Sequence, residues 1–292
     1  IGGEVPLGPV TLSEILSMAR PGVAIAAFNF TNLEDLRGIM AAAELEQAPV
    51  IIQTTETTVK HSGLEYLAAM GRAAARVAGV PVCLHLDHAT DFNLVVRAIR
   101  LGYSSVMIDG SRLPFEENVA VTAEAVRVAH AVGVSVEAEL GQVGGKEDCA
   151  CSTCCSTDGE LHLVDVDEAV EFVRRTNIDA LAPAVGTMHG IYKAPPCIRF
   201  DLIEEVHRAT GLPLVLHGGS GLPRAIVREA IVRGVRKFNV ATDLQAAYVA
   251  AWRKALANSE ENIDSRRAGA HSMEAVCKAA REKIRMCMGE ER

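Results

Sequence analysis

Short apolar runs alternate along this chain with segments whose apolar residues recur every three or four positions. The runs are rich in Val, Ile, Leu and Ala, which is typical of parallel strands buried on both faces, and the spaced segments are typical of helices. We predict eight strands, at 23–28, 49–53, 81–86, 104–108, 134–139, 178–183, 212–216 and 235–240.

Helical patterns fill the intervals after these strands, for example at 33–46, 64–78 and 201–211. Glycines such as Gly79 and Gly211 mark the joints between a helix and the next strand, as helix ends and turns require. Eight such repeats favour an α/β fold of the (β/α)8 TIM barrel type. An open, doubly wound sheet is the alternative, but no Gly-x-Gly-x-x-Gly follows the first strand.

A last amphipathic segment, at about 272–288, follows the eighth repeat. It predicts an extra C-terminal helix that packs on the barrel or on a neighbouring subunit. No linker or low-complexity tract divides the sequence, and α/β barrels of similar length commonly form one domain. We therefore expect a single domain over residues 1–292.

The charge balance excludes some classes of partner. The net charge is -8, with 37 acidic against 29 basic residues and no block of Lys and Arg, so we expect no nucleic-acid or membrane partner. No apolar stretch reaches the roughly 18 residues that a membrane span needs. Residues 1–10 lack the regions of a signal peptide, and we expect a cytoplasmic protein.

Polar side chains gather where four of the predicted strands end. The segments are LHLDH at 84–88, VEAEL at 136–140, GTMHG at 186–190 and LVLHGGSG at 214–221. Because the carboxyl ends of the strands share one mouth of a barrel, these side chains should converge. One of His85 and His88, together with His189 and His217, would form a catalytic zinc site with an open fourth position.

Taken alone, any one of these histidines is most simply interpreted as a buried residue that hydrogen-bonds a neighbour. The set as a whole argues against it, because Asp87, Asp109, Glu137 and Glu139 lie near the same strand ends. So many buried charges would be crowded without a counter-ion. A bound cation resolves the crowding.

A second pattern predicts a phosphate site. Gly218–Gly221 follows the seventh strand and 239–242 follows the eighth, where many barrels bind phosphate through backbone N–H groups and hydroxyls. A glycine-rich turn alone is more often a flexible loop. The place of these two segments in the barrel favours phosphate binding.

These motifs together resemble the class II, metal-dependent ketose-bisphosphate aldolases. The matching segments, in the family's order, are LHLDH, MIDGS, VEAELGQVGGKED, APAVGTMHGIYK, PLVLHGGSG and KFNVATDL. The lack of long insertions, and Ala241 where the long fructose-bisphosphate type commonly has Asp, make the chain more similar to the tagatose-bisphosphate type. The resemblance implies reversible cleavage of a ketose 1,6-bisphosphate to dihydroxyacetone phosphate and glyceraldehyde 3-phosphate.

The resemblance also implies residue roles. One zinc ion per subunit would bind His88, His189 and His217, with Glu139 as an alternative or outer ligand and Asp109 orienting His88. Asp87 would exchange the proton of the C4 hydroxyl, and Glu147 a proton at C3. The residues implied to hold the phosphates and the enediolate are Asn29, Thr55, Gly190, Lys193, Gly218, Gly219, Ser220, Asn239, Thr242 and Arg266, with Asn239 also catalytic. A monovalent cation near the phosphate site is a further candidate.

Several alternatives stay open at this stage. Lys237 shares strand parity with Asn239 and would serve a Schiff-base aldolase, but that mechanism leaves the histidine set unexplained. A deoxy-keto-gluconate phosphate substrate, or a non-catalytic subunit that binds metal and sugar phosphate, fits the same motifs. The cluster Cys149–Cys155 predicts exposed thiols, with a second metal site or a reversible disulfide that restrains the loop as the alternatives. A homo-oligomer, dimer or tetramer, is expected.

Overall fold

The computed structural model describes residues 8–145, 162–192, 196–257 and 264–289. Its eight strands form one closed, all-parallel barrel in sequence order, and β8 pairs with β1 to close it. This confirms the predicted (β/α)8 barrel, and every predicted strand overlaps an observed one. The strands are β1 Ile25–Asn29, β2 Val50–Thr55, β3 Val82–Ala89, β4 Ser105–Ile108, β5 Ser135–Leu140, β6 Ala180–Pro183, β7 Leu214–Leu216 and β8 Val235–Val240.

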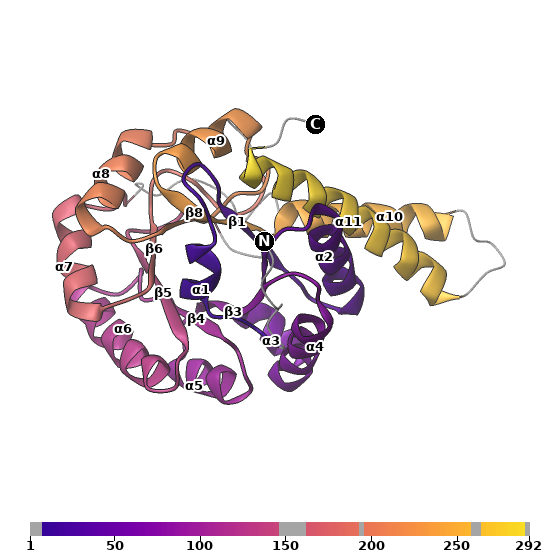
Figure 1. Ribbon diagram of the computed structural model, residues 1–292, viewed down its shortest axis with the longest axis horizontal. Coiled ribbons are helices and arrows are strands. Elements are labelled where there is room, and N and C mark those ends of the chain that lie inside the picture. The colour runs from indigo at the N-terminus through magenta and orange to yellow at the C-terminus, as the bar shows by residue number, and fades with distance from the viewer. Residues whose placement is uncertain (1–7, 146–161, 193–195, 258–263, 290–292) are drawn as a thin grey trace.

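A ring of helices surrounds the barrel (Figure 1). The ring consists of α2 Leu33–Glu46, α4 Leu64–Val77, α5 Phe92–Arg100, α6 Phe115–His130, α7 Val166–Thr176, α8 Phe200–Thr210 and α9 Arg224–Val232. Two short helices, α1 Leu12–Ser17 and α3 Glu56–Ser62, lie outside the predicted repeats. Their brevity gives too few turns for a clear helical period.

The last two helices, α10 Thr242–Ala257 and α11 Ser265–Met288, form an arm that projects to one side of the barrel (Figure 1). The returning helix α11 packs along both α10 and α2. The extra C-terminal helix is therefore present, but it begins earlier than the predicted residue 272. Asp264 caps its first turn by accepting a hydrogen bond from the Arg266 N–H, a common helix start.

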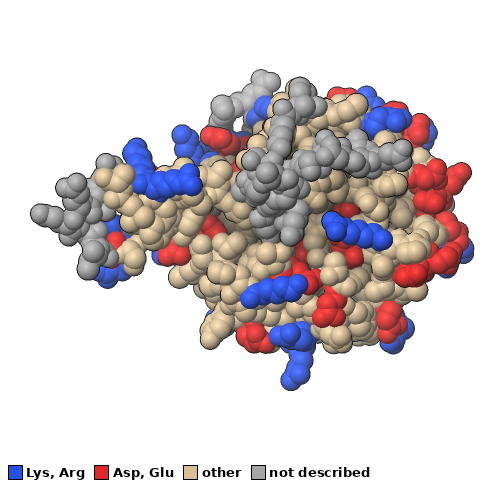
Figure 2. Space-filling model, turned by 180° about the vertical axis from the view of Figure 1, so that it is seen from behind, with Lys and Arg blue, Asp and Glu red and all other residues tan. Residues whose placement is uncertain are grey.

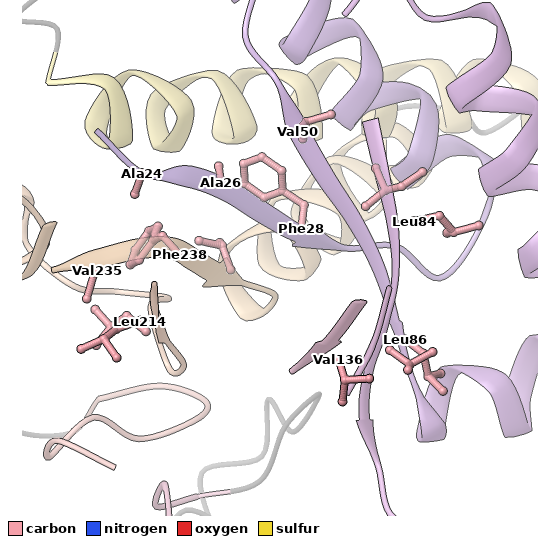
Figure 3. Close-up of a cluster of buried hydrophobic side chains, with 14 of the residues drawn as sticks. Ala24, Ala26, Phe28, Val50, Leu84, Leu86, Val136, Leu214, Val235 and Phe238 are labelled. Atoms are coloured by element: carbon pink, nitrogen blue, oxygen red, sulfur yellow. The ribbon is translucent and has the colours of Figure 1, made fainter. Parts of the chain in front are cut away.

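Successive side chains of a strand face opposite sides, and in this barrel the outer side is apolar. In β1, for example, Ala26 and Phe28 turn outward to the helices (Figure 3). The same outer layer includes Ala24, Val50, Leu84, Leu86, Val136, Leu214, Val235 and Phe238. This layer holds the helices to the barrel.

The barrel interior has two different halves. Its lower half is an apolar cluster that includes Ile25, Ile51 and Val215, and α1 closes it from below with Leu12 and Ile15. Its upper half, at the carboxyl ends of the strands, holds buried polar and charged side chains. They include Asn29, Gln53, His85, Asp87, Glu137, Glu139, Lys237 and Asn239.

The charged side chains on the surface are distributed as expected from a sequence without a block of Lys and Arg. Basic and acidic side chains are interspersed over the face in Figure 2, and acidic residues gather along the edge opposite the arm. Among the helices that the structure describes, none combines the length and apolarity needed to cross a lipid bilayer.

Candidate active site

The end of β3 delivers two functional side chains to the mouth of the barrel. His88 has a positive φ of 48°. The register with β4 also shifts between Leu86 and Ala89. Such an irregularity redirects side chains at a strand end. Asp87 keeps the inward parity of the strand, and His88, one residue later, turns toward His217. Of His85 and His88, His88 is thus the one that groups with His189 and His217, whereas His85 lies lower in the barrel beside Ser105.

The structure brings His88, His189 and His217 together. Each offers one ring nitrogen, and these atoms all lie within 4.8 Å of one another. The ring centroids are 4.9 Å apart for His88 and His189, 4.5 Å for His88 and His217, and 5.7 Å for His189 and His217. The three imidazoles come from the ends of β3, β6 and β7, as the sequence predicted.

Two carboxylates determine which ring nitrogen of His88 and of His217 faces the middle of the histidine group. The Nδ1 atom of His88 lies 2.9 Å from Asp109 Oδ2, and the Nε2 atom of His217 lies 2.9 Å from Glu137 Oε1. Burial alone would raise the pKa of Asp109, but the hydrogen bond with His88 holds it well below its ordinary value. Ionised carboxylates only accept hydrogen bonds, so both of these ring nitrogens carry the hydrogen.

The two remaining nitrogens of these rings, His88 Nε2 and His217 Nδ1, lie 2.7 Å apart. When both rings are neutral, with their hydrogens given to the carboxylates, two lone pairs face each other across this distance. A cation bound by both nitrogens removes that repulsion and uses neutral imidazoles as ligands. The donor set therefore fits a divalent metal of the zinc type.

Glu139 lies at the edge of the same group. Its Oε1 accepts a hydrogen bond from the Val143 N–H at 3.2 Å, and its Oε2 lies 3.9 Å from His88 Nδ1. No donor of the described residues hydrogen-bonds to this buried Oε2 atom. Burial, and then the charge of Asp109, raise the pKa of Glu139. A nearby cation would satisfy this oxygen, as expected of an alternative ligand.

Three side-chain amides hold the carboxylate of Asp87. Gln53 Nε2 donates to Oδ2 at 2.9 Å, Asn29 Nδ2 approaches the same oxygen at 3.4 Å, and Asn239 Nδ2 approaches Oδ1 at 3.4 Å. Gln53 also donates to Asn29 Oδ1 at 2.9 Å. Gln53 is not among the residues predicted from the sequence, although its place two residues before Thr55, on the inner face of β2, is a usable signal.

Below Asp87 lies a second polar layer. The Nζ atom of Lys237 donates to Glu137 Oε2 at 2.7 Å. Lys237 does point inward, as the Schiff-base alternative requires, but its ammonium is ion-paired and so is not presented as a nucleophile. Burial, together with the charge of Lys237, holds the pKa of His85 well below its ordinary value, so His85 is neutral.

The loops after β7 and β8 lie against each other, as the phosphate prediction requires. Ser220 Oγ accepts hydrogen bonds from the N–H groups of Ala241 and Asp243, both at 3.3 Å. The Gly219 N–H donates to the Asn239 carbonyl at 3.2 Å. Thr242 is buried at the start of α10. These contacts place the loop 218–221 beside the first turn of α10, whose N–H groups suit an anion.

Two other predicted positions, Gly190 and Thr55, lie after β6 and at the end of β2. Gly190 has a φ of 91°, in the region that favours glycine. Two residues later, Tyr192 donates from its hydroxyl to the Gly218 carbonyl at 2.8 Å, which ties the loops after β6 and β7 together. Thr55 is buried at the end of β2, where its Oγ1 accepts from the Thr58 N–H and caps α3.

Of the remaining predicted features, one lies away from the site and three fall outside the described residues. Arg266 lies in the first turn of α11, with a side chain that is 89% exposed and ion-paired to Asp264 at 2.9 Å. The first turn of α11 is at the outer end of the arm (Figure 1). Within this chain it does not share the barrel mouth with the histidines. Glu147, Lys193 and the cluster Cys149–Cys155 lie outside the described residues.

The chain is similar to known proteins over nearly its whole length. The family model described as "Fructose-bisphosphate aldolase class-II" matches residues 10–292. A "Probable fructose-bisphosphate aldolase" of Bacillus subtilis is 42% identical over 280 residues, which cover 94% of this chain and 96% of that protein. A "Fructose-bisphosphate aldolase" of Staphylococcus aureus is also 42% identical, with the same coverage.

The solved structure of an aldolase is also similar to this chain. The crystal structure of the YdjI aldolase from Escherichia coli K12 matches with a TM-score of 0.83 and 34% identity, over 95% of this chain and 96% of that one. Both the family match and the relatives cover nearly the whole barrel. The chain belongs to the class II fructose-bisphosphate aldolase family and is an aldolase, a carbon–carbon lyase.

Proposed function

We propose that this enzyme uses one zinc ion to cleave a ketose 1,6-bisphosphate reversibly into dihydroxyacetone phosphate and glyceraldehyde 3-phosphate. The observation that carries the proposal is the convergence of three imidazoles beside the buried carboxylate of Asp87. Metal ligands and a proton acceptor at one barrel mouth are what cleavage beside a ketone needs. The relatives' names support fructose bisphosphate as the substrate. Tagatose 1,6-bisphosphate is the second candidate, from the sequence motifs alone.

The proposed metal ligands are His88, His189 and His217, with Glu139 as an alternative ligand. When bound, the ion supplies a Lewis acid that polarises the substrate's carbonyl oxygen. Asp109 and Glu137 orient the two rings that they contact, which fixes the ligand nitrogens before metal arrives.

Asp87 is the proposed base for the C4 hydroxyl. The amides of Gln53, Asn29 and Asn239 hold its carboxylate at the mouth and donate to its charged form. Removal of the C4 hydroxyl proton lets the bond between C3 and C4 break as the aldehyde forms. From the sequence alone, Glu147 is proposed to return a proton to C3. Two separate carboxylates allow the two proton transfers to occur at different atoms.

The substrate's C1 phosphate is proposed to bind the loops after β6, β7 and β8. The support is their mutual contact through Ser220 and Tyr192 and the backbone N–H groups that they gather. The proposed binding residues are Asn29, Thr55, Gly190, Lys193, Gly218, Gly219, Ser220, Asn239 and Thr242. A monovalent cation beside this phosphate remains a proposal from the sequence.

The arm supports a homo-oligomeric assembly. Val249 and Leu256 of α10 are exposed apolar side chains on a projecting helix, and a second copy could cover them. In such an assembly Arg266 could serve the site of a neighbouring copy, which this chain's own mouth does not allow. Sedimentation of the purified enzyme would test for a dimer or tetramer. A cytoplasmic location remains a prediction.

A substrate panel tests the proposed reaction. Fructose 1,6-bisphosphate, tagatose 1,6-bisphosphate and a deoxy-keto-gluconate phosphate are compared by kcat/KM, with release of the three-carbon product detected by coupled assays. We expect one of the two ketose bisphosphates to have the highest kcat/KM. Preference for the deoxy-keto-gluconate phosphate would contradict the substrate assignment, and no cleavage of any substrate by the zinc-loaded enzyme would favour a non-catalytic subunit.

A further inference from the structure

Lys237 is a lysine enclosed in the middle of the barrel. It lies on β8 two residues before Asn239, so both side chains face the interior, while Phe238 between them packs outward. Its side chain is fully buried. A buried ammonium is costly unless an opposite charge lies close to it. The chain therefore needs a specific partner for Lys237.

That partner is Glu137, on the far strand β5. The Nζ atom lies 2.7 Å from Glu137 Oε2, and both side chains are fully buried. The same Oε2 atom lies 3.6 Å from His85 Nε2, which in turn is 3.9 Å from Asp87 Oδ1. The ammonium thus contributes a positive charge to the group formed by His85, Asp87 and Glu137.

The group of His85, Asp87 and Glu137 has the residue types of a second metal site. Ligand atoms of His85, Asp87 and Glu137 lie within 4.8 Å of one another. A metal ion there would have to displace or repel the ammonium that already contacts Glu137. Lys237 therefore takes the place that a second cation would fill.

The ion pair has a consequence for the metal ligands above it. With Oε2 engaged by Lys237, the other oxygen of Glu137 accepts the hydrogen of His217 Nε2 at 2.9 Å. This leaves His217 Nδ1 as the nitrogen that faces His88. The contacts run without a break from an ammonium in the barrel centre to the ligand atom of a proposed metal site.

We propose that Lys237 is a positioning residue: its ammonium anchors Glu137, and Glu137 holds His217 in the orientation that presents Nδ1 to the metal. This inference rests on the proposed metal site. It assigns to the lysine no contact with substrate and no covalent step.

Cobalt binding tests the proposal without using catalysis. Metal-free wild type, Lys237→Met and the exposed-site control Lys278→Met are titrated with Co²⁺ against a chelating indicator, and their visible spectra are recorded. His189→Ala reports any Co²⁺ bound elsewhere on the chain, and that signal is subtracted. We expect Lys237→Met to bind Co²⁺ about 10 to 100-fold more weakly and with an altered spectrum, since outer partners of metal ligands have effects of this size. Lys278→Met should match the wild type.

A double variant keeps the test decisive if loss of Lys237 alone prevents folding. Lys237→Met with Glu137→Gln removes both charges together, so it leaves no unpaired buried ion. It should fold, as judged by circular dichroism, and still bind Co²⁺ about tenfold more weakly than the wild type, because an amide oxygen is a weaker acceptor than a carboxylate.

The outcomes separate the two proposals. Wild-type affinity and spectrum in a folded Lys237→Met variant, or in the double variant, would overturn the role of Lys237 and leave the metal site intact. Failure of the wild type itself to bind Co²⁺ through His189 would instead overturn the proposed function.

Discussion

The two halves of the barrel interior are built on the same strands, but the lower half is an apolar core and the upper half holds the candidate active site. Ile51 and Gln53 are two residues apart on β2, both face inward, and both are fully buried. The lower residue packs in an apolar cluster closed by α1, whereas the upper one hydrogen-bonds Asp87. Burial stabilises the lower half directly, while in the upper half it must be offset by paired charges and hydrogen bonds. Two equally buried residues on one strand therefore differ in role: Ile51 stabilises the barrel, and Gln53 belongs to the candidate active site.

The largest expected effect lies in the upper half. Asp87→Asn should lower kcat by about 10²–10⁴-fold, because the amide cannot accept the C4 hydroxyl proton. Bound zinc and the melting temperature should stay near wild type, as measured by metal analysis and thermal unfolding. Asp91→Asn, which alters an exposed capping carboxylate outside the barrel, is the matched control and should retain activity. A normal kcat in Asp87→Asn would remove this residue from the mechanism.

The lower half should show the reverse pattern. Ile51→Ala leaves a cavity in the closed apolar cluster and should cost roughly 2–5 kcal/mol of unfolding free energy. Zinc affinity and kcat at low temperature should change little, because Ile51 belongs to the apolar cluster and not to the group formed by His88, His189 and His217. Ile51→Val, with a smaller expected loss of about 0.5–1.5 kcal/mol, grades the effect by volume. If folded Ile51→Ala has a much lower kcat or zinc affinity than the wild type, the apolar half also determines activity, and the comparison fails.

Glu139 tests the cost of burial in the upper half. Its pKa is raised by burial, and then by Asp109, above the ordinary value of 4.5. A carboxyl group with a raised pKa in the folded state is best tolerated when protonated, so its stability contribution is lost as the pH rises through the folded pKa. Glu139→Gln should thus stabilise the metal-free protein at neutral pH by roughly 1–3 kcal/mol.

The gain from Glu139→Gln should shrink as the pH falls toward 4.5. Thermal unfolding of metal-free protein between neutral and acidic pH measures it, with the exposed Glu205→Gln as control. Equal or lower stability of the Glu139 variant at neutral pH would show that this carboxylate is well solvated or paired without metal.

Gln53 should give the smallest effect. Gln53→Met removes the 2.9 Å hydrogen bonds to Asp87 and Asn29 but leaves the two longer amide contacts in place. One such bond corresponds to about tenfold in kcat, with zinc content unchanged. Steady-state kinetics check this, and an unchanged kcat would mean that Asn29 and Asn239 suffice to hold Asp87.

The sequence predicted the barrel because its strands are continuous apolar runs, each followed by a helical period. Strand alternation alone could not choose between His85 and His88, since the irregular register and positive φ at the end of β3 break the parity rule. Strand parity did place Lys237 inward, but its pairing with Glu137 spans the barrel and depends on closure. The position of Arg266 on the arm likewise depends on packing between helices, which periodicity does not encode.

Zinc titration of demetallated enzyme tests the central claim most directly. Chelator-treated enzyme is assayed for cleavage of the preferred ketose bisphosphate before and after stepwise addition of Zn²⁺, beside a His189→Ala variant. The account predicts negligible activity without metal, full recovery near one bound zinc ion per chain, and no recovery in the variant. Full velocity in rigorously demetallated enzyme, or normal recovery in His189→Ala, would contradict it.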